Sequence, residues 1–381
     1  MLAVQGFMEL VFWFSVSVVF YVYAGYPLLL AVWARLADRR PRITHFEHGR
    51  WPSITVVVAV RNEAHRLTAR LANLIEQDYP GPRQIIVVSD GSTDEPARAV
   101  APFGRDVQLI ELPPGGKPAA LNAGAMAARG AILVFADARQ RFAPGALRAL
   151  VANFADPEVG GVTGELVLDC EVGAADSTIG EGIGLYWKYE KWLRRNESRV
   201  WSTLGATGAI YAMRRSLWQP LPASSLLDDV LAPMRAVLAG SRVVFEEAAV
   251  AYDQASRDAA AESRRKTRTL AGNYQILAQE PRLLVPIVNP VWLQYVSHKI
   301  GRLVVPWALV ALLVSSAVLA SLAWLYVAAF VAQAAFYALA AAGAWLNVRE
   351  RLSRVAFTFV MMNYSAVAGL AALRRGREVW R

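Results

Sequence analysis

Three short apolar runs of this sequence end in polar residues, and each end carries a carboxylate. The runs end at Glu63, at the segment Asp90–Asp94 and at Asp137. A carboxylate in such a place can accept hydrogen bonds from a uracil ring or ribose hydroxyls, or hold a divalent cation that neutralises a diphosphate. Asp90–Asp94 alone would also suit an ordinary turn, because Asp, Gly and Ser favour turns. The three sites together favour a nucleotide-binding site.

A glycine-rich loop offers a second candidate for phosphate binding. Gly115 and Gly116 stand directly before Lys117, and a helical stretch with Asn122 follows. Such a loop can bring backbone amides and one ammonium group up to phosphate oxygens. The spacing is not that of a Walker loop, so an NTPase has little support. A helix-entry turn with a solvated lysine is the alternative.

Two adjacent acids, Asp228 and Asp229, follow apolar residues and precede the helical stretch 230–238. One of them suits a general base, because sugar transfer with inversion needs a single carboxylate to take the proton from the attacking hydroxyl. The alternative is an acid that caps the helix and stabilises its dipole.

A basic segment follows, which holds Arg264, Arg265, Lys266 and Arg268. Near a diphosphate, a cationic helix face would help to bind the donor and the leaving group. A basic face that meets solvent or lipid headgroups is the alternative.

The elements that must position these residues alternate between short β-branched runs and longer helical stretches over residues 52–278. This pattern predicts an α/β fold with parallel strands and helices on both faces. Strands are expected over residues 54–60, 84–88, 132–135, 160–168 and 242–245. Helices are expected over residues 64–78, 118–128 and 230–238. Ligands of such sheets bind beyond the carboxyl ends of the strands, where the polar residues stand.

The composition indicates a membrane protein, with 55% hydrophobic residues and a mean hydropathy of +0.29. Residues 10–34 and 303–348 carry no charge. Since one crossing takes about 20 apolar residues, the first run predicts one transmembrane helix within residues 1–36 and the second predicts two. A third C-terminal candidate, residues 355–373, extends this membrane part to 303–373. Residues 279–302 are expected to be interfacial, and buried core helices are the alternative to all these spans.

The net charge of +9 does not call for a nucleic-acid partner, because much of the excess flanks the apolar runs. The basic linker 37–51 places the domain 52–278 in the cytosol by the positive-inside rule. Four spans that start outside the cell would leave the basic tail 374–381 outside as well, which conflicts with the positive-inside rule. Either the last run lies in the membrane interface or the rule fails there. The single cysteine, Cys170, is consistent with a reducing compartment.

The ordered motifs resemble those of the inverting family 2 glycosyltransferases, especially the membrane-bound bacterial group of cellulose, hyaluronan and poly-N-acetylglucosamine synthases. Residues 58–63 resemble the opening strand of that family, residues 77–80 the end of its first helix, and residues 88–94 its first acidic motif. The resemblance covers residues 52–278. It implies a GT-A fold with flanking transmembrane helices, a UDP-sugar donor, a saccharide or lipid-linked acceptor, contact with membrane lipids, and a place in the bacterial inner membrane.

The residues and the resemblance together assign a role to each part of the site. Asp229 matches the catalytic base of the family, and Asp228 stands beside it. Donor-binding residues are expected to be Asn62, Glu63, Asp90, Lys117, Asn122, Asp137, Arg139, Arg265 and Arg268. Acceptor-binding residues are expected to be Gly205, Thr207, Gly208 and, as a stacking surface, Trp187. Asp137 matches the first acid of the Asp-x-Asp motif, so the implied cofactor is Mg²⁺ or Mn²⁺ with Asp137 as ligand.

Two departures from the family pattern bear on these roles. Arg139 replaces the second acid of the Asp-x-Asp motif, so either Asp137 binds the cation with diphosphate and water, or Arg139 itself supplies positive charge. Arg265 and Thr269 stand where the processive synthases have the Gln and Trp of Gln-x-x-Arg-Trp, and only Arg268 is retained. The aromatic platform for a growing polymer is absent there, which weakens the case for processive synthesis.

Two other functions stay open. Transfer of one sugar to a polyprenyl phosphate or another lipid would be compatible with the modest number of spans. A non-catalytic membrane subunit with the same fold would explain the missing metal-ligating acid. A transporter has little support, because the apolar runs contain no acidic residue.

Overall fold

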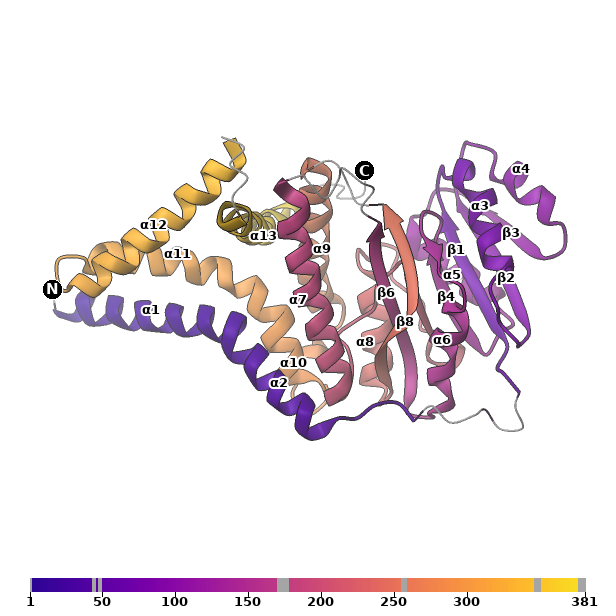
Figure 1. Cartoon of the computed structure of the whole chain (residues 1–381), viewed down its shortest axis with the longest axis horizontal. Coiled ribbons are helices and arrows are strands. Elements are labelled where there is room, and N and C mark those ends of the chain that lie inside the picture. The colour runs from indigo at the N-terminus through magenta and orange to yellow at the C-terminus, as the bar shows by residue number, and fades with distance from the viewer. Residues whose placement is uncertain are drawn as a thin grey trace.

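The computed structural model describes residues 2–42, 46, 50–169, 178–254, 259–345 and 351–375. An α/β domain forms one side of the molecule, and long apolar helices project from the other side (Figure 1). Helices α7 (Thr178–Val200) and α9 (Ala259–Gln279) stand between the two parts. Cys170 and the last six residues of the basic tail lie outside the described residues.

One sheet of eight strands, in the order β3-β2-β1-β4-β7-β6-β8-β5, organises the α/β domain. Its strands are β1 (Ile54–Val60), β2 (Arg83–Asp90), β3 (Val107–Leu112), β4 (Ile132–Asp137), β5 (Arg141–Phe142), β6 (Val159–Asp169), β7 (Ile210–Arg214) and β8 (Arg242–Gln254). The sheet is mixed, which corrects the expectation of parallel strands only. β7 runs antiparallel to β4 and β6, and β5 runs antiparallel to β8.

Helices cover both faces of the sheet, as the alternation of elements predicted. On one face α3 (Ala64–Ile75) and α6 (Ala146–Ala152) pack on the residues of β1 with even numbers, Ile54 to Val60. On the other face α5 (Lys117–Ala127) and α8 (Asp228–Leu238) pack against Val57 and its neighbours. α5 lies so close that a Cβ at Gly124 would stand 2.4 Å from the Val57 side chain. The α/β fold class is confirmed.

Most element positions follow the hydrophobic pattern, and the differences lie at the ends. β1 has the predicted bounds, while β2 and β4 run on to Asp90 and Asp137, so both carboxylates belong to the strand ends. β3 and β7 were not predicted. β7 follows a loop at the edge where β4 ends, so it must run back along β4 in the opposite direction.

The remaining helices of the α/β domain are short. They are α4 (Pro96–Val100), η3 (Ala101–Phe103), η4 (Asn153–Ala155), η5 (Arg215–Leu217) and η6 (Pro281–Leu284). The apolar part consists of α1 (Leu2–Phe20), η1 (Tyr21–Gly25), α2 (Tyr26–Ala37), α10 (Trp292–Gln294), η7 (Tyr295–Ile300), α11 (Gly301–Leu319), α12 (Trp324–Trp345) and α13 (Arg351–Arg374).

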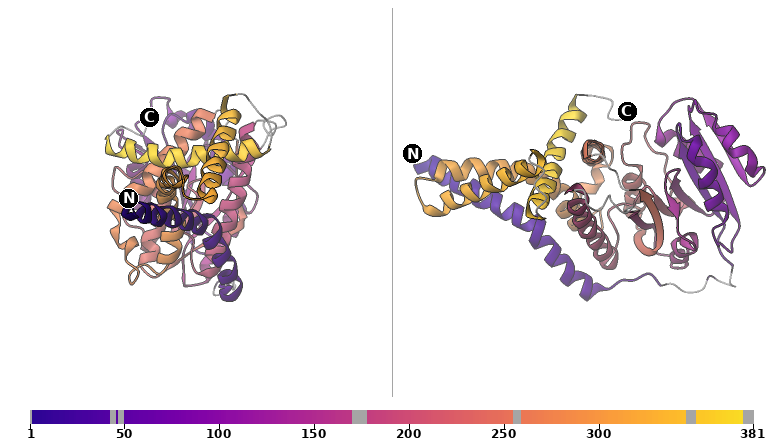
Figure 2. Two further views of the ribbon diagram at one scale, coloured as in Figure 1. Left: turned by 90° about the vertical axis from the view of Figure 1, so that its left-hand side faces the viewer. Right: turned by 45° about the horizontal axis from the view of Figure 1, so that its top comes forward.

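Four helices in the described part of the chain are long and apolar enough to cross a membrane. They cover Leu2–Ala37, Trp292–Leu319, Trp324–Gly343 and Leu352–Arg374. The second begins at Trp292, so the C-terminal half of the segment expected to be interfacial is continuous with the span. α1, α11 and α12 extend away from the α/β domain, whereas α13 is seen end-on in Figure 1 and lengthwise in the left view of Figure 2. α13 therefore lies across the others and packs on α9.

Candidate active site

A cavity of about 860 Å³ lies beyond the carboxyl ends of β1, β2 and β4. Its sheet end is lined by Glu63, Asp90 and Asp137 from the strand ends, and by Asp228 and Asp229 from the start of α8. Its far end reaches α7, α9 and the first turns of the helix that leads into the membrane part. The acids that are far apart in the sequence thus face one space, in which a nucleotide sugar has room.

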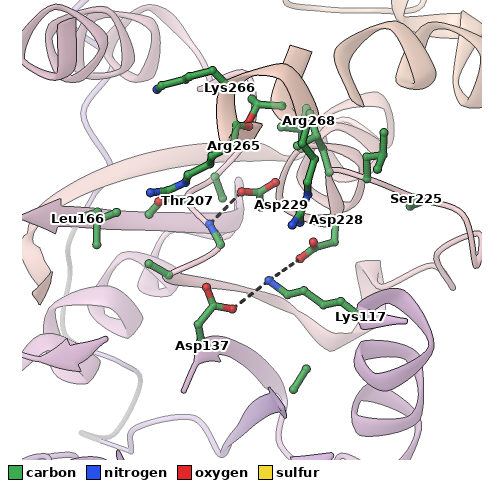
Figure 3. Close-up of a pocket in the computed structure, with 18 of the residues that line it drawn as sticks. Lys117, Asp137, Leu166, Thr207, Ser225, Asp228, Asp229, Arg265, Lys266 and Arg268 are labelled. Carbon is green, nitrogen blue, oxygen red and sulfur yellow. Dashed lines mark hydrogen bonds and ion pairs between the residues drawn. The ribbon is translucent and has the colours of Figure 1, made fainter. Parts of the chain in front are cut away.

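Lys117 joins two of these acids at the centre of the cavity (Figure 3). Its ammonium nitrogen lies 2.9 Å from Asp137 Oδ1 and 3.6 Å from Asp228 Oδ2. Burial alone would lower the pKa of Lys117, but the carboxylates of Asp137, Asp228 and Asp229 outweigh burial and raise this pKa. The lysine therefore stays charged and offers a fixed cation to an incoming phosphate.

The two acids of α8 have different surroundings. Burial raises the pKa of Asp228 to about 6, although the Lys117 ammonium acts against this rise. Asp229 instead accepts a hydrogen bond through Oδ2 from the backbone N–H of Gly208, at 3.0 Å. A Cβ at position 208 would stand 3.3 Å from that oxygen, so glycine lets the loop approach closely. The second oxygen of Asp229 can take a proton from a substrate hydroxyl.

The carboxylate of Asp90 binds the glycine-rich loop that the sequence suggested as a phosphate-binding loop. Asp90 is 4% exposed, and its carboxylate accepts hydrogen bonds from the N–H groups of Gly115 at 2.6 Å and Gly116 at 2.9 Å. These amides are therefore engaged by the protein's own carboxylate. The loop positions Lys117 at the start of α5 instead of holding phosphate through its backbone.

Three residues of the predicted site are not among the described residues that line the cavity. Asn62 binds the neighbouring loop, where its Oδ1 accepts the N–H of Thr93 at 2.9 Å. Asn122 exchanges two hydrogen bonds with the backbone of Leu221. Gly205 adopts a φ of +130°. Their direct contact with donor or acceptor therefore stays a prediction that the cavity lining does not support.

Arg139 lies at the cavity with a carboxylate partner of its own. It lines the cavity, but its guanidinium is paired with the Asp253 carboxylate on β8. Asp253 is buried and also accepts a hydrogen bond from Gln140 at 2.9 Å. The positive charge of Arg139 is thus neutralised beside β8, and it is not the free charge that the sequence suggested in place of a metal ligand.

The basic segment on α9 reaches the cavity as predicted. Figure 3 shows Arg265 and Arg268 extending from α9 toward Thr207 and the two aspartates of α8, while Lys266 points elsewhere. The ammonium group of Lys266 lies 4.6 Å and 5.0 Å from the ring centroids of Tyr186 and Trp187. Trp187 lines the cavity, but one of its faces is covered by a cation.

The residues at the membrane end of the cavity were not expected from the sequence. Glu190 on α7 pairs with Arg302 and lies 3.5 Å from His298, whose Nδ1 is 2.7 Å from Glu197. Lys299 lines the same end. The sequence does hold a signal for this end of the cavity, because His298, Lys299 and Arg302 directly precede the uncharged run that starts at residue 303. Charged residues at the end of a span mark a functional site or an interface.

A metal ion would need ligands from the substrate at this site. Within the described part of the chain, no three carboxylate, imidazole or thiol side chains gather closely enough to hold one. Mg²⁺ commonly binds one or two carboxylates together with substrate phosphates and water. Asp137, 35% exposed, fits the role of such a single ligand, and the buried Oδ2 of Asp228 has no hydrogen-bond partner in the described structure.

Known proteins similar to this chain are glycosyltransferases. The family described as Glycosyl transferase family 2 matches residues 55–219. An N-acetylglucosaminyltransferase of Rhizobium meliloti is 32% identical over 47% of this chain and 42% of its own length. One from Bradyrhizobium elkanii is 30% identical over 30% of this chain and 67% of its own length. The chain spans less than half the length of the first of these relatives.

A solved structure matches nearly the whole chain. It is a mannosyltransferase of Pyrobaculum calidifontis in complex with GDP-Man and Mn²⁺, with a TM-score of 0.73 over 97% of this chain and 100% of that one. At 24% identity the likeness concerns the fold. The sheet, the match over β1 to β7 and the relatives agree with a GT-A-type fold. The chain therefore belongs to glycosyl transferase family 2.

Proposed function

We propose that this enzyme inverts the anomeric centre while it transfers a sugar from a UDP-sugar to a hydroxyl of a polysaccharide or glycolipid at the membrane. The observation that carries the proposal is the position of Asp229, held by the Gly208 N–H at 3.0 Å in the same cavity as Lys117 and the strand-end carboxylates. N-acetylglucosamine is the first sugar to test, because the rhizobial relatives transfer that sugar by name.

Each residue has a distinct task in this reaction. Asp229 takes the proton from the acceptor hydroxyl as that oxygen attacks the anomeric carbon. Lys117, Arg265 and Arg268 bind the diphosphate and stabilise the charge that develops as it leaves. Asp228, with a pKa raised by burial to about 6, holds Lys117 in place once it is ionised.

A divalent cation would share the diphosphate with these cationic side chains. Asp137 is its proposed protein ligand, and the bound cation would supply further charge neutralisation for the leaving group. Glu63 and Asp90 remain proposed for the nucleoside side of the donor, and Trp187, Thr207 and Gly208 for the acceptor. All of them line the cavity.

We place the catalytic domain in the cytosol of a bacterium, at the inner membrane. α12 returns toward the α/β domain, and α13 then lies across the other apolar helices (Figure 2). With three spans and α13 in the membrane interface, the basic linker and the basic residues after α12 all lie on the cytosolic side. This arrangement removes the conflict that four spans create.

A donor screen of the purified full chain tests the proposal. We expect turnover of one UDP-sugar with a membrane-extract acceptor, dependence on Mg²⁺ or Mn²⁺, and a product linkage whose anomeric configuration is opposite to that of the donor by NMR. Retention of configuration would contradict the role of Asp229. Failure to hydrolyse or transfer from any nucleotide sugar would favour the alternative of a non-catalytic subunit.

A further inference from the structure

The loop that carries Gly208 is tied to Asp229 through its backbone. The N–H of Ala206 donates to the carbonyl of Asp229 at 2.6 Å, and the N–H of Gly208 donates to Asp229 Oδ2 at 3.0 Å. One residue, Thr207, lies between these two donors, and its N–H donates to a different partner. Asp229 is therefore held at its backbone and at its side chain by a loop that needs an anchor of its own.

The partner of the Thr207 N–H is Thr163, on β6. The hydroxyl of Thr163 accepts this N–H at 2.9 Å and donates to the carbonyl of Gly164 at 3.3 Å. Thr163 is 0% exposed, and its strand pairs with β7 at Tyr211 and with β8 at Phe245. Because a closely packed interior leaves a buried side chain between paired strands little room to shift, this hydroxyl is a rigid acceptor.

Planar peptide groups extend this anchor to Gly208. The peptide between Thr207 and Gly208 is held at its carbonyl by the N–H of Ile210, at 3.1 Å, and at its N–H by Asp229. The N–H of the preceding peptide is held by Thr163. Loss of that bond would free Thr207 to rotate, and the N–H of Gly208 would no longer be fixed on Oδ2 of Asp229.

We propose that Thr163 is a positioning residue for the catalytic base. Through the N–H of Thr207 it holds the loop that directs the N–H of Gly208 at Oδ2 of Asp229, so that the other carboxylate oxygen is left for the proton of the acceptor hydroxyl. The inference rests on the proposed function, because it assigns a cause to the orientation of that base. Thr163 is not among the described residues that line the cavity, so it acts through the loop.

The chain offers a matched control at the other end of the sheet. Thr55 on β1 is also 0% exposed, and its hydroxyl accepts a backbone N–H at the same distance, 2.9 Å, from Gly130. It stands near the start of β1, whereas the cavity lies beyond the end of that strand. Thr55→Val and Thr163→Val each remove a buried hydroxyl and leave one N–H without its acceptor. Both variants should lose stability, but only Thr163→Val should affect Asp229.

Hydrogen exchange of the full chain in a neutral detergent tests the anchor without donor or turnover. In Thr163→Val, peptides that contain residues 206–208 should exchange about tenfold faster, because the loss of one buried hydrogen bond is enough for that factor. Thr163→Ser should restore slow exchange, since serine keeps the hydroxyl. Thr55→Val should speed exchange at Gly130 and leave residues 206–208 unchanged. Unchanged exchange of residues 206–208 in Thr163→Val would overturn the inference.

Steady-state kinetics test the consequence for the base. Thr163→Val should lower kcat by about tenfold to a hundredfold, because a shift of about 1 Å in a catalytic group can cost about 10² in rate, while KM for the donor stays within about twofold. Thr163→Ser and Thr55→Val should keep kcat. Thr163→Cys, whose thiol accepts hydrogen bonds weakly, should give a smaller loss than Thr163→Val, and it carries the test if the valine variant does not fold.

The kinetic outcomes separate positioning from stability. Equal losses of kcat in Thr163→Val and Thr55→Val would reduce the effect to stability and overturn the inference, as would an unchanged kcat in Thr163→Val despite faster exchange of residues 206–208. If exchange responds as expected but the unmodified chain turns over no nucleotide sugar, the anchor of the loop stands and the proposed function fails.

Discussion

The two ends of the cavity are built in different ways. At the sheet end, each carboxylate stands at or just beyond the end of a strand or at the start of α8, and the hydrogen bonds of the sheet fix its position. At the membrane end, α7, α9, η7 and α11 each contribute side chains, and contacts of His298 and Arg302 with acids of α7 join that helix to η7 and α11. The first end is rigid because it belongs to the fold, whereas the second depends on how helices pack.

This difference predicts how each end responds to substitution. A change at the sheet end should act on chemistry and on donor binding while the fold stays intact. A change at the membrane end should disturb helix packing, acceptor binding or both.

Asp229→Asn tests the base at the sheet end. Loss of a general base typically costs about 10²–10⁴-fold in rate, so we expect transfer to fall by about that factor while nucleotide binding persists. Single-turnover kinetics and nucleotide titration measure the two quantities. Asp106→Asn, on an exposed loop, is the control and should behave like the unmodified chain. Full turnover by the Asp229 variant would remove the proposed base.

Glu190→Gln tests the membrane end. This change leaves the largely buried Arg302 without its carboxylate, which typically costs about 3 kcal/mol or more in stability. Thermal unfolding in a neutral detergent should show the loss. Glu158→Gln is the control, because Glu158 is 67% exposed in its contact with Arg242 and should change stability by less than about 1 kcal/mol. Equal shifts for both variants would contradict the proposed packing role.

The pH dependence of kcat/KM should report Asp228. Because burial raises its pKa to about 6, kcat/KM should fall as the pH drops below about 6. Stability should follow the opposite trend: the folded pKa lies above the ordinary 3.8, so this group lowers stability as the pH rises from about 4 to 6.

Lys117→Gln sharpens that assignment. The Lys117 ammonium lowers the pKa of Asp228, so its removal should move the acidic limb of the residual activity to higher pH. The limb should disappear in Asp228→Asn. A limb that keeps its position in both variants would belong to another group.

Arg139→Ala should have the smallest effect. Because the charge of Arg139 is already neutralised by the buried Asp253, we expect nucleotide affinity to stay within about threefold of the unmodified chain. Fluorescence titration with a labelled UDP would measure it. A tenfold loss would restore the role that the sequence suggested for this arginine.

Much of the fold could be predicted because its signals are local. The strands at residues 54–60 and 132–137 and the helix at 117–127 follow from apolar runs and their breaks. β7 was missed because its five residues stand after a glycine-rich loop and carry no alternation of their own. β8 was predicted too short, because its second half pairs with β5 and with β6 beyond a bulge.

By itself, the sequence determined the α/β class, the apolar helices and the acids at strand ends, because periodicity and strand breaks depend on near neighbours along the chain. Only the tertiary structure decided that Arg139 is bound to Asp253, that Asp90 occupies the amides of Gly115 and Gly116, and that Glu190 meets Arg302. A charged side chain takes its partner from whichever element packs beside it, and that partner can stand 25 positions away, as for Asp90 and Gly115, or 114 positions away, as for Arg139 and Asp253.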